Sequence, residues 1–188
     1  NFELEVPQLF ADGSRFDPVG YRNAFSHDEH DLLRSVQDKV RWFTEAWFGR
    51  RIAPVSNILV QMGPFRMLRQ LGNAFGIERL SVFEAGPGAG YLGAFLAEAG
   101  HRYISYDITQ SYYLWQSCLM EAVSGKHLVE LALGTEDDDA RTINSLDYNL
   151  MHGRVVHMPW WTFASILPGT TLRTDVIYSN SNLSEMSR

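Results

Sequence analysis

Residues 81–90 have the sequence SVFEAGPGAG, and this stretch decides the fold that the sequence predicts. Its first half, residues 81–85, is a short and mostly apolar run of the kind that forms a buried parallel strand. Three glycines follow at alternate positions: Gly86, Gly88 and Gly90. Glycine adopts backbone torsions that a Cβ forbids, and it lets the chain approach a ligand closely. The stretch therefore predicts a strand followed by a ligand-binding turn.

Helices and strands alternate on the C-terminal side of this turn. An apolar helical segment over residues 91–99 ends at Gly100, and residues 103–106 predict a second strand that ends at Asp107. Further predicted elements are helices over 109–125 and 161–167 and strands over 155–158 and 175–179. Such alternation is typical of a parallel sheet with crossover helices. We therefore expect residues 79–188 to form an α/β core with a Rossmann-like parallel sheet of about four strands.

Residues 1–78 form a separate, mostly helical segment in this interpretation. After an irregular stretch, Ser26 and Glu29 have the spacing of a capping box, in which each side chain bonds the other's backbone N–H. Apolar residues then recur every three or four positions, which predicts a helix of about six turns. A second helical stretch is expected to kink or break at Gly63-Pro64 and to end at Gly76. Two roles stay open for this segment: a cover over the pocket, or a dimerisation element of a homodimer.

An acidic residue accompanies the glycine turn at the end of the next predicted strand. Asp107 lies 19 residues after Gly88, and a carboxylate there accepts hydrogen bonds from ribose hydroxyls. The crevice above the carboxyl ends of parallel strands is where such sheets bind ligands. Two structural alternatives exist, since Asp107 could only cap the following helix and the glycines could only form a tight turn. Together, the turn and the acid predict a site for an adenosine-containing cofactor.

Two cofactors fit this pattern in different frames. Gly88, Gly90 and Gly93 match the G-x-G-x-x-G spacing of dinucleotide binding. The other frame is an acid followed by alternating glycines, and it begins at Glu84. A carboxylate at the strand end would repel a pyrophosphate, whereas it suits the ammonium of a methionine-like tail. Glu84 therefore favours S-adenosylmethionine, and the open alternatives are an NAD(P)-dependent oxidoreductase and a non-catalytic scaffold of the same fold.

With this glycine turn and with Asp107, the sequence resembles the class I S-adenosylmethionine-dependent methyltransferases. The resemblance covers about residues 80–180, and residues 175–186, DVIYSNSNLSEM, look like the fourth-strand motif of that family. A narrower resemblance is to bacterial sugar O-methyltransferases. These resemblances imply methyl transfer to a small molecule, foremost O-methylation, with a sugar as one acceptor class. The family's sheet has more strands than this sequence supplies, so we expect the core to be truncated at its C-terminal end.

The resemblance also implies roles for individual residues near the strand ends. The residues that it assigns to the cofactor are Glu84, Gly86, Gly88, Gly90, Asp107, Met158, Trp160 and Asn180. The glycines would line the methionine part, with Glu84 facing its amino group and Asp107 holding the ribose. Met158 and Trp160 would lie near the adenine, and Asn180 would lie beside the transferred methyl.

Transfer to a hydroxyl requires that the acceptor lose its proton. A general base works best when its pKa lies near the working pH. His157 and Glu185 are the candidates, because both lie near predicted carboxyl ends of strands. A structural or surface role is the alternative for each. A metal-assisted route would need carboxylates clustered at these strand ends, and Asp175 lies at the opposite end of its strand, so we predict no metal site.

Composition limits the compartment and the partners. Of the 188 residues 45% are hydrophobic, which predicts a packed core rather than a disordered chain. The net charge is -6 without long runs of one sign, so nucleic acid is not the expected partner. No apolar stretch approaches the roughly 20 residues that cross a bilayer, and we find no signal peptide. The single cysteine, Cys118, fits a reducing compartment. We expect a cytoplasmic enzyme that acts on a small molecule.

Overall fold

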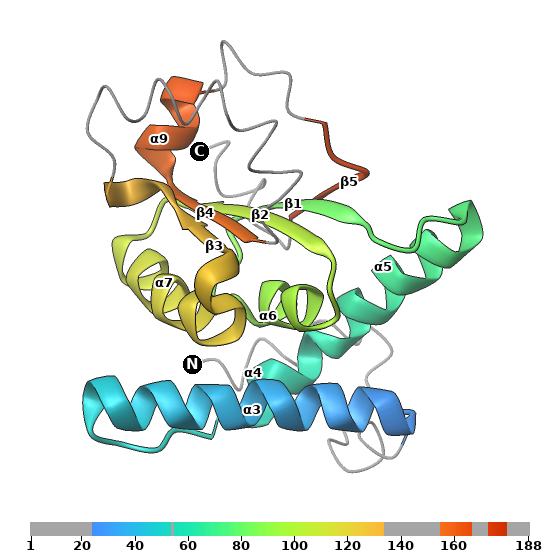
Figure 1. Ribbon diagram of the computed structural model, residues 1–188, viewed down its shortest axis with the longest axis horizontal. Coiled ribbons are helices and arrows are strands. Elements are labelled where there is room, and N and C mark those ends of the chain that lie inside the picture. Colours follow the sequence, from blue (N-terminus) through green and yellow to red (C-terminus); the bar gives the residue numbers. More distant parts are fainter. Residues whose placement is uncertain (1–23, 54, 134–154, 167–172, 180–188) are drawn as a thin grey trace, which may run out of the picture.

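The computed structural model describes residues 24–53, 55–133, 155–166 and 173–179 of the chain (Figure 1). Its centre is a sheet of five parallel strands in the order β3-β4-β2-β1-β5. The strands are β1 (Ser81–Ala85), β2 (Arg102–Asp107), β3 (Leu128–Glu130), β4 (Val155–Pro159) and β5 (Val176–Tyr178). The predicted α/β class with a Rossmann-like parallel sheet is therefore confirmed.

The sequence predicted four of these strands and missed β3. The predicted runs over 103–106, 155–158 and 175–179 correspond to β2, β4 and β5 with small differences at their ends. β3 has only three residues and pairs with β4 at one edge of the described sheet. Such a short strand shows no usable alternation of apolar and polar positions, because its pairing partner rather than its own pattern holds it in place.

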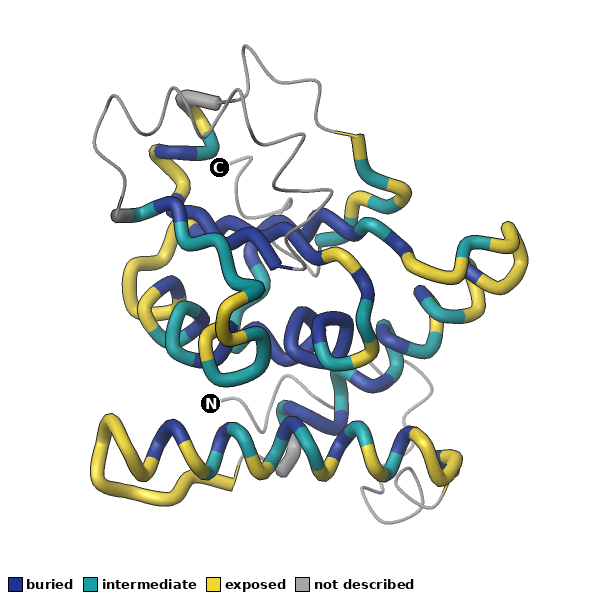
Figure 2. The backbone as a smooth tube through the Cα atoms, viewed as in Figure 1, coloured by how far each residue is buried: buried dark blue, intermediate teal, exposed yellow. Residues whose placement is uncertain are grey.

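Helices cover both faces of the sheet (Figure 1). The elements around it are α6 (Tyr91–Glu98), α7 (Gln110–Ser124), α9 (Trp160–Ile166) and two short 3₁₀ turns, η2 (Gly125–His127) and η3 (Leu131–Leu133). α6 and α7 pack on the face that carries Val82 and Tyr103. α9 lies on the opposite face, where its Phe163 packs against the cluster that contains Tyr106. Figure 2 shows β1, β2, β4 and α6 as the most deeply buried of the described elements, whereas β3 and β5 are less buried.

Three further helices precede the sheet: α3 (His27–Phe48), α4 (Val55–Val60) and α5 (Met62–Phe75). α3 runs beneath α6 and α7 as an outer layer (Figure 1). Phe43 of α3, Phe65 of α5 and Phe95 of α6 belong to one hydrophobic cluster. The sequence predicted two parts, a helical segment up to residue 78 and a sheet after it. In the structure the two parts share this hydrophobic cluster. Among the described helices, none is both long and apolar enough to cross a bilayer.

The predicted interruption between the N-terminal helices lies at Gln61, slightly before Gly63-Pro64. Pro64 falls within the first turn of α5, where a backbone N–H has no intrahelical carbonyl to bond. Phe65 follows it, and its N–H donates to the Gln61 carbonyl at 3.2 Å. Gly76 ends α5 in the left-handed conformation, with φ of 67°, as the sequence predicts.

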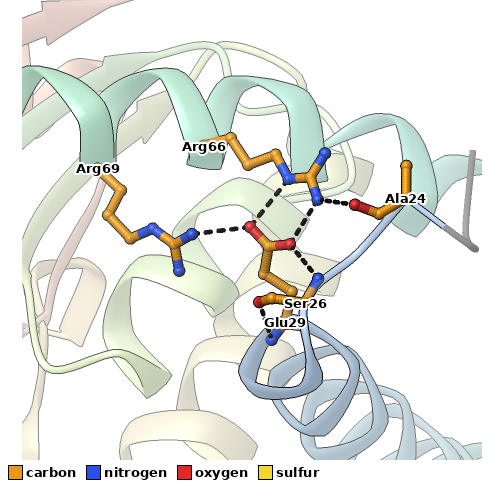
Figure 3. Close-up of polar contacts among 5 residues, drawn as sticks. All are labelled: Ala24, Ser26, Glu29, Arg66 and Arg69. Atoms are coloured by element: carbon orange, nitrogen blue, oxygen red, sulfur yellow. Dashed lines mark hydrogen bonds and ion pairs between the residues drawn. The ribbon is translucent and has the colours of Figure 1, made fainter.

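An ion cluster around the buried Glu29 joins the start of α3 to two partly exposed arginines of α5 (Figure 3). Glu29 is 2% exposed. Its side chain closes the predicted capping box, since Oε2 accepts from Ser26 N–H at 2.8 Å and Glu29 N–H donates to Ser26 Oγ at 3.3 Å. The Arg66 guanidinium donates to both carboxylate oxygens, at 2.9 and 2.5 Å, and Arg69 donates to Oε1 at 2.9 Å. Hydrogen bonding to Arg66, more than any other contact, lowers the pKa of Glu29 to about 2.

We expect Glu29→Gln to destabilise the fold by about 3 kcal/mol at pH 7, because it leaves two guanidinium groups beside a neutral amide. The pKa of Glu29 lies below its ordinary value of 4.5. The stability from this carboxylate is therefore complete above pH 4.5 and is lost as the pH falls toward 2. Urea unfolding of the wild type and the variant at pH 7 and pH 3 measures both effects.

The matched control is Asp38→Asn, which removes an exposed ion pair from the same helix. The Asp38 side chain is 61% exposed and lies 2.9 Å from Arg41, so its loss is expected to cost less than about 0.5 kcal/mol. Equal effects of the two substitutions, or a difference between wild type and E29Q that does not shrink at pH 3, would contradict the proposed role of Glu29.

Candidate functional site

The glycine turn joins β1 to α6 and has left-handed backbone at three positions. Gly86, Gly88 and Gly90 have φ of 67°, 56° and 74°, torsions that favour glycine over residues with a Cβ. Backbone hydrogen bonds close the turn: Gly86 N–H donates to the Tyr106 carbonyl at 3.0 Å, and Gly90 N–H donates to the Pro87 carbonyl at 2.9 Å. The shape of the turn therefore requires the three glycines that the sequence singled out.

The turn lies where the strand order reverses. β1 pairs with β2 on one side and with β5 on the other, so the strands that follow β1 add to both of its sides. In open parallel sheets the ligand crevice forms outside the carboxyl ends of the strands at such a switch point. The glycine turn and the end of β2 are therefore at the position where this class of sheet binds its ligand.

Asp107 ends β2 close to the glycine turn and is 4% exposed. Its Oδ1 accepts from Thr109 N–H and its Oδ2 from the Gln116 amide, each at 2.8 Å. The same Gln116 nitrogen donates to the Gly88 carbonyl at 2.6 Å. Thr109 is the N-cap residue of α7, and its side chain makes no capping bond. Asp107 thus keeps about two of its four lone-pair positions for further donors.

Glu84 lies on β1 just before the turn, on the face covered by α6 and α7, and it is 2% exposed. Its Oε2 accepts from the Tyr103 hydroxyl at 2.5 Å. Burial, with a smaller contribution from the negative charge of Asp107, raises the pKa of Glu84 to about 7, although the Tyr103 hydrogen bond acts in the opposite direction. Asp107, the second acid that the sequence singled out, is therefore close enough to affect the charge of Glu84.

Gly93 makes room for the partner of Glu84. A Cβ on Gly93 would lie 2.3 Å from two carbons of the Tyr103 ring and 2.7 Å from its hydroxyl. Any side chain at this position of α6 would displace the tyrosine from Glu84. Gly93 therefore acts in close packing of helix on strand, the role of the third glycine in a dinucleotide fingerprint.

Polar residues form a row across the sheet at the level of Glu84. Strand pairing places them in register: Glu84 with Ser105 and Tyr178, Ser105 with His157, and His157 with Glu130. Registered residues of parallel strands share a face of the sheet. This row could not be predicted from the sequence, because polar residues at single positions of separate strands become neighbours only through strand order and register.

His157 occupies the middle of this row and is fully buried. Its Nε2 lies 3.3 Å from the Tyr113 carbonyl, and its Nδ1 lies 2.9 Å from Ser105 Oγ. Burial lowers the pKa of His157 to about 4, so the ring is neutral. Since a carbonyl only accepts, Nε2 carries the proton, and Nδ1 accepts from Ser105. The lone pair of the imidazole is therefore already used by the Ser105 hydroxyl, which argues against the predicted role of His157 as base.

The remaining predicted contacts differ in burial or lie outside the described residues. Met158 is 2% exposed and belongs to the cluster under α9. Trp160, the first residue of α9, is 49% exposed and packs edge-on against Trp161. Asn180 and Glu185 lie outside the described residues. The structure therefore brings together Glu84, the glycine turn and Asp107, whereas Met158 and Trp160 occupy different environments.

Glu84 and Asp107 have no cationic partner among the described residues. The described lysine and arginine ion pairs involve other acids, and the neutral His157 supplies no charge. Within the same residues, no three His, Cys, Asp or Glu side chains form a possible metal site. Buried carboxylates are normally paired or metal-bound, since an isolated buried charge is costly. The site therefore holds two buried acids without a balancing cation among the described residues, and burial of Glu84 raises its pKa accordingly.

Comparison of the chain with protein-family models, curated proteins and solved structures found no match. Glu84, Asp107 and the glycines could be predicted from the sequence as site residues. Tyr103 and Gln116, whose side chains donate to Glu84 and Asp107, were not among the predicted residues. The only available signal was that a tyrosine and a glutamine stand at positions of a strand and a helix that face the core.

We expect Glu84→Gln to remove a loss of stability that the ligand-free wild type undergoes between pH 4.5 and about 7. The pKa of Glu84 is raised from 4.5 to about 7. The contribution of Glu84 to the free energy of unfolding is therefore most favourable below pH 4.5. It falls by up to roughly 3 kcal/mol as the pH rises to 7. The glutamine does not ionise, so this loss is absent. Urea unfolding at several pH values between 4.5 and 8 measures the difference.

Glu121→Gln is the control, because Glu121 is an exposed residue of α7. Its unfolding free energy is expected to follow that of the wild type at every pH. A wild type and an E84Q variant with parallel pH profiles would show that Glu84 ionises as an ordinary exposed carboxyl group.

Proposed function

We propose that this chain binds S-adenosylmethionine and transfers its methyl group to an oxygen of a small molecule. One observation carries the proposal: two buried acids, Glu84 and Asp107, lie beside a glycine turn at the switch point of a parallel sheet, with no cation among the described residues to balance them. A ligand that is itself positively charged suits such a site. S-adenosylmethionine carries both an ammonium and a sulfonium, and its ribose supplies donors for a carboxylate.

The chain's contribution to this chemistry is binding and orientation. Bound S-adenosylmethionine supplies a methyl group on a cationic sulfur, and an acceptor hydroxyl gives up its proton as it attacks. Asp107, fixed by Thr109 and Gln116, would hold the ribose, and Glu84 would face the amino group. Holding the acceptor in line with the methyl is the main source of rate in such a reaction. Glu185 stays the candidate base.

The proposal includes a sugar as the methyl acceptor and the cytoplasm as the location of the protein. A sugar hydroxyl follows from the narrower resemblance noted above. The net charge of -6 supports a small molecule over nucleic acid. The cytoplasm is the proposed location, because the chain carries one cysteine and so cannot form an internal disulfide.

A nicotinamide-dependent oxidoreductase is the second candidate, and the packing of Gly93 favours it. The third glycine of the dinucleotide fingerprint allows helix and strand to approach closely, and Gly93 does so against Tyr103. Glu84 argues against this candidate, because its carboxylate would lie near the pyrophosphate. In the methyltransferase proposal, the close packing at Gly93 instead leaves room for Tyr103 to donate its hydrogen bond to Glu84.

A thermal-shift comparison separates these candidates. S-adenosylhomocysteine at about one hundred times its Kd is expected to stabilise the protein by about 2.7 kcal/mol, which raises Tm by several degrees. NAD(H) at the same concentration is expected to leave Tm unchanged. Stabilisation by NAD(H) alone would establish the oxidoreductase, and no response to millimolar amounts of either ligand would favour a non-catalytic scaffold.

Asp107→Ala is expected to weaken binding of S-adenosylhomocysteine by about 1–3 kcal/mol, because it removes charge-assisted hydrogen bonds to the ribose. Isothermal titration calorimetry measures the change. Asp38→Ala, an exposed residue of α3, is the control. Unchanged affinity in D107A would remove Asp107 from the nucleoside site.

A further inference from the structure

One side-chain amide joins the glycine turn to the acid at the end of β2. Gln116 lies on α7 and is fully buried. Its Nε2 donates to the Gly88 carbonyl at 2.6 Å and to Asp107 Oδ2 at 2.8 Å. Both hydrogens of the amide are therefore used, one on each side of the proposed nucleoside site.

The orientation of this amide is determined by its partners. A carbonyl and a carboxylate only accept hydrogen bonds, so the nitrogen of Gln116 must face them both. Its oxygen then points elsewhere, and Oε1 is buried without a hydrogen-bond donor among the described residues. A buried carbonyl without a donor costs free energy. A packed apolar residue would avoid that cost, so stability alone does not account for a glutamine here.

The glycine turn and Gln116 also fit each other sterically. A Cβ on Gly90 would lie 3.1 Å from Gln116 Cγ and 3.4 Å from Met120 Cε. The second partner of Asp107, the Thr109 N–H, holds only the other carboxylate oxygen. The Gly86 N–H also bonds the Tyr106 carbonyl, which joins the turn to the backbone of β2, whereas Gln116 bonds the Asp107 carboxylate itself and so links its orientation to the turn.

We propose that Gln116 is a positioning residue of the nucleoside site, which aligns the Asp107 carboxylate with the glycine turn so that Asp107 can bind ribose hydroxyls. This inference rests on the proposed function and adds to it the residue that orients the ribose contact. Gln116 acts through Asp107 in this proposal, so its removal affects recognition of the ribose more than recognition of the rest of the ligand.

The test compares two ligands, S-adenosylhomocysteine and its 2′-deoxyribose analogue, by isothermal titration calorimetry. The wild type is expected to prefer the ribose form about tenfold. Gln116→Met keeps the length of the side chain and removes the N–H donors. This variant is expected to bind S-adenosylhomocysteine about tenfold more weakly and to lose most of the preference, because a misaligned carboxylate no longer distinguishes the two sugars. In a background with Asp107→Asn, the same substitution is expected to add little.

Gln110→Met is the matched control, since it makes the same change at an exposed residue of the same helix. It is expected to keep both the affinity and the preference. Gln116→Asn retains an amide but is one methylene shorter, so it provides a second variant with the same expected loss if Q116M does not fold.

The possible outcomes separate the inference from the proposed function. A variant that binds more weakly but keeps the ribose preference would show that Gln116 has only a structural role, and the methyltransferase proposal would stand. A wild type that binds neither ligand would overturn both.

Discussion

The burial of Glu84 at the end of β1 is the constraint on which the rest of the site depends. A carboxylate that is 2% exposed needs a donor, and the Tyr103 hydroxyl provides one at 2.5 Å. The tyrosine reaches it only because Gly93 has no side chain. One interaction thereby determines the residue types at three positions, on β1, β2 and α6. It also places Glu84, with its pKa near 7, next to the glycine turn. This turn lies at the switch point of the sheet, where parallel sheets bind their ligands.

The same face of the sheet serves as core and as site. Near the amino ends of the strands it carries Val82, Tyr103 and Val155, which pack against the helices. At the next level along the same face, the polar row with Glu84 and His157 begins. α6 and α7 cover both levels, and α3 covers these helices in turn (Figure 1). The N-terminal helices therefore contribute to the site indirectly, because they fix the helices that hold its polar residues.

Much of this organisation could be predicted from local pattern. The capping box of Ser26 and Glu29, the glycine turn and the acid at the end of β2 are each defined by residues near one another in the chain, so short-range stereochemistry specifies them. β3 could not be predicted, since three residues carry no periodicity. Gln116 could not be assigned either. A glutamine on a helix is ordinary, and its importance comes from contacts with Gly88 and Asp107, which approach it only in the folded chain.

The sequence by itself determined the class of fold, the left-handed turn and the presence of two acids near it, because backbone torsions and the order of strands and helices depend on local residue types. Only the tertiary structure decided how those acids are held and what lies beside them. Strand order and register placed His157 within a buried polar row with both nitrogens in contact, and packing buried Met158 while Trp160 stayed half exposed. Such pairings depend on which strands become neighbours, and that is a property of packing across the whole chain.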